Sequence, residues 1–144
     1  MSLPPLQTLV LLAGVGQIAL ALASLAIPRV LRFEEETAKL RPLLRQMFWT
    51  YAGYILCTNL SFGLLSALAP TWLLDGSPLA AAVTGFIAVY WGARVVLQFA
   101  WFDRSDAPPG AHVRLAEAAL VLLFVFLTCV YGLALAANLR DGPG

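Results

Sequence analysis

Residues 6–27 read LQTLVLLAGVGQIALALASLAI, a run of 22 residues without a charged side chain. A helix needs about 20 apolar residues to cross the roughly 30 Å hydrocarbon core of a bilayer, because each residue rises 1.5 Å. This run therefore predicts a membrane-spanning helix and decides the class of fold. The segment before it, Met1–Pro5, contains no Lys or Arg, so we do not expect a cleaved signal peptide.

Three further runs of similar length follow along the chain. Two of them contain one charged residue each, Arg94 and Glu117, and the other contains none. We expect an all-α integral membrane protein, a four-helix transmembrane bundle with short loops, in which residues 1–144 form a single domain. The predicted spans are residues 6–27, 46–69, 78–102 and 115–139.

The composition supports a membrane protein. Hydrophobic residues make up 60% of the chain and charged residues 12%, whereas soluble domains carry about 25% charged residues. The net charge is only +1, so we expect no nucleic-acid partner. Cys57 and Cys129 both lie inside apolar runs, and we expect them to be small buried residues without a disulfide framework.

The placement of Lys and Arg predicts the orientation in the membrane. Seven of the nine basic residues fall in the connections 28–45 and 103–114, which lie on the same side of a four-span protein. The positive-inside rule then places both termini outside the cytoplasm. We expect a bacterial inner (cell) membrane. The longer connection, 28–45, fits either a short helix resting on the membrane surface or a solvated charged loop.

Each predicted span carries its polar residues on one face of a helical wheel. Hydrocarbon does not tolerate such groups, so these stripes should converge inside the bundle or at an oligomer contact. The four stripes are Gln17 and Ser24; Tyr51, Tyr54 and Thr58; Tyr90, Trp91, Arg94, Gln98 and Trp101; and Glu117, Thr128, Tyr131 and Asn138.

Arg94 is the most informative single residue. It lies nine residues before Asp103, roughly 13 Å along the helix axis, and an arginine at such depth costs about 2.5 kcal/mol or more unless it is paired or hydrated. Glu117 enters the fourth span from the same side, which predicts an ion pair. The candidate ligand-binding residues are Arg94, Gln98, Glu117, Tyr51, Tyr54, Tyr90 and Trp91.

Three interpretations of this polar cluster remain open. Arg94 can extend along Gln98 to the interface, or it can pair with Glu117 as structural support for helix register. The functional interpretation is a site for a lipid headgroup, a quinone-like molecule or an anionic substrate.

Small residues predict a close helix contact in the third span. Gly85, Val89, Gly92 and Val96 share one face, opposite Arg94, and a smooth face of this kind lets helix backbones approach.

No motif for catalysis, metal or cofactor binding is present: the sequence contains no HExxH, CxxC or P-loop pattern. We expect no cofactor, no metal and no catalytic residue. The favoured function is a non-enzymatic accessory subunit, or a component that binds a small ligand or lipid, in a homo-oligomer or larger membrane complex. The alternative is a small membrane enzyme or carrier for a lipid-like or quinone-like substrate, with a cytoplasmic-side pocket around Arg94 and Glu117.

Overall fold

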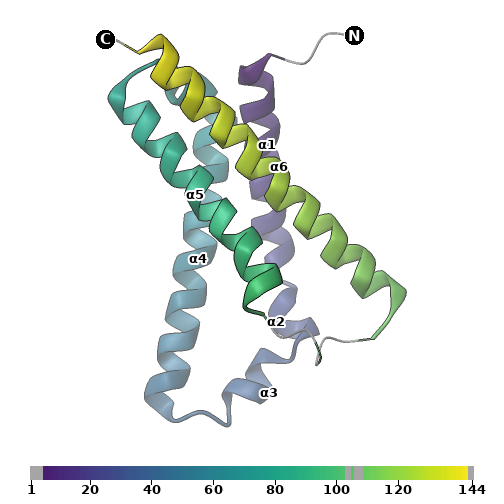
Figure 1. The fold of residues 1–144 in the computed structure, drawn as a ribbon. Coiled ribbons are helices and arrows are strands. Elements are labelled where there is room, and N and C mark those ends of the chain that lie inside the picture. The colour runs from purple at the N-terminus through teal and green to yellow at the C-terminus, as the bar shows by residue number, and fades with distance from the viewer. Residues whose placement is uncertain (1–4, 103–104, 106–108, 143–144) are drawn as a thin grey trace.

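The computed structural model describes residues 5–102, 105 and 109–142. All regular structure in these residues is helical, and four helices are long and apolar enough to cross a membrane. In chain order the elements are α1 Leu6–Ser24, α2 Ile27–Val30, α3 Phe33–Thr37, α4 Pro42–Leu68, the 3-10 helix η1 Pro70–Leu73, α5 Pro78–Ala100 and α6 Ala111–Asp141 (Figure 1).

The helix ends differ from the predicted spans where charged residues flank an apolar run. Both α4 and α6 begin four residues earlier than predicted, at Pro42 and Ala111. Charged residues end the apolar run, but they do not interrupt backbone hydrogen bonding. The helix can therefore continue beyond the apolar run. Pro42 and Pro78 stand in the first turns of α4 and α5, where the missing N–H costs nothing. The hydroxyl of Ser77 caps α5 by accepting from the Ala80 N–H at 3.0 Å.

The long connection between α1 and α4 contains two short helices, α2 and α3. Arg32 adopts a left-handed conformation (φ 55°) between them, directly before α3. The Phe33 ring then packs edge-on against Phe48 and Trp49 of α4, with ring centres 5.3 and 6.2 Å away. Lys39 pairs with Glu36 at 3.0 Å.

The connection between α4 and α5 is held by one side chain from α6. Asn138 donates from Nδ2 to the Leu73 carbonyl at 2.7 Å and accepts at Oδ1 from the Gly76 N–H at 3.0 Å. Gly76 has a φ of +78°, which favours glycine, and a Cβ there would lie 3.1 Å from the Asp141 carbonyl oxygen. The turn therefore docks on the end of α6.

The four long helices pack as two pairs, α1 with α4 and α5 with α6, and α1 also contacts α6. In the first pair the backbones come close at two glycines: a Cβ added to Gly14 would lie 2.8 Å from the Gly63 carbonyl oxygen. In the second pair Gly85 and Gly92 of the predicted smooth face meet the side chains of Leu135 and Thr128. Val89 and Val96, the other two residues of that face, are exposed and do not take part.

Burial divides the bundle into two halves. Except for Gln98, every buried residue of the four long helices lies in what we call the closed half, made of residues 6–21, 59–68, 78–91 and 124–141. The rest of these helices forms the open half. There every residue of α4 from Pro42 to Tyr51 is exposed, and no residue of α6 from Ala111 to Leu123 is buried.

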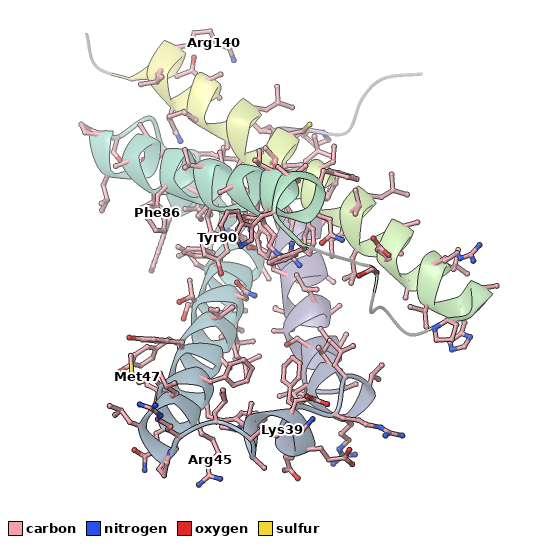
Figure 2. The ribbon with its side chains drawn as sticks, turned by 60° about the horizontal axis from the view of Figure 1, so that its bottom comes forward. Lys39, Arg45, Met47, Phe86, Tyr90 and Arg140 are labelled. Atoms are coloured by element: carbon pink, nitrogen blue, oxygen red, sulfur yellow. The ribbon has the colours of Figure 1, made fainter. Side chains whose placement is uncertain are left out.

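Figure 1 shows the shape behind this division: α4 and α6 diverge toward the end that carries α2 and α3, and the start of α1 and the end of α6 lie at the opposite end. Figure 2 places Lys39 and Arg45 at the open end and Arg140 at the other. Cys57 and Cys129 are exposed, so the expectation that they are buried was wrong.

Candidate functional site

Arg94, Gln98 and Glu117 form one hydrogen-bonded chain across α5 and α6. Arg94 and Gln98 lie one turn apart on α5, and the Arg94 Nη1 donates to Gln98 Oε1 at 3.0 Å. The Gln98 Nε2 in turn donates to Glu117 Oε1 at 3.1 Å. The predicted partners therefore belong to one network, but the interactions between the described residues connect them through Gln98 instead of through a direct ion pair. An amide can do this because it both accepts and donates.

Two aromatic rings flank the Arg94 guanidinium. Its Cζ lies 4.9 Å from the ring centre of Phe102 and 4.9 Å from that of Phe124. A desolvated cation–π contact contributes about 0.5–2 kcal/mol, whereas an arginine at bilayer depth costs about 2.5 kcal/mol or more. The two rings and the hydrogen bond to the Gln98 amide oxygen stabilise the guanidinium, but they add no negative charge.

Tyr90 and Trp91 lie beside this hydrogen-bonded network and connect α5 to α4 and α1. The Tyr90 hydroxyl donates to Asn59 Oδ1 of α4 at 2.7 Å. Figure 2 labels Tyr90 next to α4. Trp91 is buried, stacks on Phe124 with ring centres 5.4 Å apart, and donates from Nε1 to Gln17 Oε1 at 3.0 Å. Five of the seven candidates thus lie together on α5 and α6.

Tyr51 and Tyr54 do not join them. Both point outward from the open half of α4, with 55% and 66% of their surface exposed. The stripe was expected to converge inside the bundle or at an oligomer contact; its two tyrosines do not reach the interior of the single chain, and the oligomer contact stays a prediction. The physical reason is the divergence of α4: its first turns, which carry Tyr51, lie away from α5 and α6 (Figure 1).

A second polar network, in the closed half, joins residues from four helices. The Gln17 amide donates to the Tyr131 hydroxyl, which also shares a hydrogen bond with the Ser66 hydroxyl, and Trp91 donates to Gln17. Gln17, Ser66 and Tyr131 are completely buried. Sequence patterns placed Gln17 and Tyr131 on inward stripes, but neither Ser66 nor Asn59 stood out, since a lone serine or asparagine has no spacing signal.

A groove opens where α5 and α6 diverge. It has a volume of about 460 Å³ and is lined by Phe99, Arg114, Glu117, Ala118, Val121 and Leu122. Most of its lining is apolar, and the two charged residues stand near the start of α6. Such a surface suits an amphipathic molecule better than a fully polar one.

Comparison with known proteins adds no assignment: no family model matches the chain, and no curated protein or solved structure shows significant similarity to it. Within residues 5–102, 105 and 109–142, no three His, Cys, Asp or Glu side chains gather where they could hold a metal ion. The arrangement offers a half-buried cation, an amide relay and a carboxylate beside an apolar surface, which together suit binding.

Proposed function

We propose that the chain is a small integral membrane protein of a bacterial inner membrane, with both termini outside the cytoplasm. In this proposal it serves as a non-catalytic component of a membrane assembly. The closed half is the rigid body and the open half is the binding surface. Four helices of spanning length and an outer surface rich in large exposed hydrophobic residues support membrane insertion.

The observation that carries the assembly role is the free part of α4. From Pro42 to Tyr51, the stretch that we call the free part of α4, every residue is exposed, although Phe33 of α3 packs against Phe48 and Trp49. The exposed side chains include Met47, Phe48, Trp49 and Tyr51. Aromatic residues and Met are enriched in the cores of protein interfaces, and a helix that lies outside its own bundle offers them to a partner helix.

The test is site-specific photocrosslinking in intact membranes. A photoreactive residue replaces Tyr54 in the open half or Leu68 in the closed half; both positions are on α4 and both are exposed, at 66% and 79%. We expect a discrete protein adduct from position 54, identified by mass spectrometry, and only lipid adducts from position 68. Lipid adducts alone at both positions would overturn the assembly role, and an adduct of twice the chain mass would identify a homo-oligomer.

A second candidate function is an enzyme or carrier for a lipid-like or quinone-like substrate. The chain from Arg94 through Gln98 to Glu117, beside an apolar groove, favours it. It predicts a lipid species that accumulates or disappears when the protein is produced, and that no longer changes with Glu117→Gln. A membrane lipid profile that is independent of the protein would exclude it.

A further inference from the structure

We propose that Arg94 binds the oxyanion headgroup of an acidic amphiphile that enters the open half from the cytoplasmic leaflet. This inference rests on the membrane insertion in the proposed function and names the class of ligand for the same site. The ligand is a carboxylate or phosphate attached to an apolar tail.

The first argument is the unused hydrogen-bonding capacity of Arg94. A guanidinium carries five N–H donors, and among the described residues only Nη1 has an acceptor, the Gln98 amide oxygen at 3.0 Å. No fully buried side-chain nitrogen or oxygen of the described residues lacks a partner. It follows that Nε and Nη2 of Arg94 are reachable from outside the protein. They form the edge with which arginine binds an oxyanion through two parallel hydrogen bonds.

The second argument is charge. The rings of Phe102 and Phe124 flank the cation without neutralising it, and the Glu117 carboxylate is held on the far side of the Gln98 amide. A neutral quinone-like molecule would leave the positive charge in place. An anion would neutralise it at close range, in surroundings where water is scarce.

The third argument is depth, which requires the tail. Arg94 lies six residues before the end of α5 at Ala100, about 9 Å along the axis, in a helix of spanning length. An anion has to enter the apolar layer to reach it. Neighbouring apolar side chains, Leu97 at 40% and Phe102 at 47% exposed, offer contact to a tail. A water-soluble anion gains nothing from these surfaces, whereas an amphiphile does.

Trp91 provides a signal for occupancy. Its ring stacks on Phe124, and Phe124 contacts Arg94, so a ligand at Arg94 should change the emission of Trp91. Replacing the other three tryptophans by Trp49→Phe, Trp72→Phe and Trp101→Phe leaves this reporter alone in the full-length chain.

The experiment titrates this protein in neutral detergent micelles with oleate, phosphatidylglycerol, oleyl alcohol and inorganic phosphate. We expect a saturable change with oleate, phosphatidylglycerol or both, and none with oleyl alcohol. A response to oleate alone identifies a carboxylate and a response to phosphatidylglycerol alone identifies a phospholipid headgroup. An equal response to inorganic phosphate would show that the ligand needs no apolar tail, and an equal response to oleyl alcohol would show that it needs no negative charge. Either result would overturn the proposal.

Matched variants assign the site. Arg94→Gln should weaken binding at least tenfold, Arg94→Lys should weaken it less, and Arg140→Gln, at an exposed arginine of the closed half, should leave it unchanged. If Arg94→Gln does not fold, Arg94→Lys still decides, because it keeps the charge and loses the two-pronged geometry. Unchanged affinity in the folded Arg94 variants contradicts the proposal. The crosslinking at position 54 does not involve Arg94, so the two proposals can fail separately.

Discussion

The Tyr131 side chain of α6 links α1 and α4 in the closed half. Its hydroxyl contacts both the Gln17 amide and the Ser66 hydroxyl, and all three side chains are completely buried. Tyr131→Phe removes that oxygen and leaves two polar groups short of a partner, at an expected cost of about 1–2 kcal/mol in unfolding free energy. Unfolding in mixed micelles of mild detergent and dodecyl sulfate measures it. Tyr54→Phe, at an exposed hydroxyl, is the control; equal curves for both variants would refute a supporting role.

The contribution of the α4–α5 turn to stability should depend on pH because of Asp75. Hydrogen bonds from the side chain and backbone N–H of Ser77 lower the pKa of Asp75 below its ordinary value of 3.8. A lowered pKa in the folded state means stability that is complete above about pH 4 and is lost as the pH falls through the folded-state value. Melting temperatures between pH 6 and 3 should therefore converge for wild type and Asp75→Asn at the acid end. A constant difference across that range would show that ionisation of Asp75 does not contribute.

At the scale of helices, the contact between α1 and α4 depends on two glycines. A Cβ at Gly14 would lie 2.5 Å from the Ala67 backbone nitrogen, so Gly14→Ala must push the backbones apart, at an expected cost of about 1–3 kcal/mol. Gly53→Ala on α4 is the matched control, because no atom lies within 4 Å of its added Cβ. That variant should unfold like wild type or slightly later, since Ala favours helix more than Gly does. Similar losses in both variants would argue against a close contact.

The sequence pattern selected a different pair of glycines for the close contact. Gly85 and Gly92 do face α6, but their added Cβ atoms would meet only side chains, at ordinary contact distances of 3.5 Å. The difference arises because a small residue marks a close approach only when the facing residue is small too. Gly14 has Gly63 opposite it, whereas Gly85 has Leu135. Which residues face each other is a property of two helices that are distant along the chain.

For the whole molecule, the distribution of charge predicts the topology. The two connections that carry seven of the nine Lys and Arg residues should lie in the cytoplasm, and Gly144 should lie outside. A reporter enzyme that is active only in the cytoplasm should therefore be silent when fused after Gly144. The same reporter inserted in the connection between α1 and α4 should be active. The reverse pattern would invert the orientation and move the open half to the other leaflet.

The sequence by itself determined the four long helices, because an apolar run of sufficient length and the prolines at its ends act locally. It also placed Arg94, Gln98 and Glu117 on facing stripes, since one helical turn separates residues of one face. Only the tertiary structure decided that Gln98 stands between Arg94 and Glu117, and that Tyr51 and Tyr54 point away from them. The physical reason is that a helix surrounded by apolar residues can rotate and tilt at little cost in burial. Its final position is set by contacts with distant helices, such as Gly14 with Gly63.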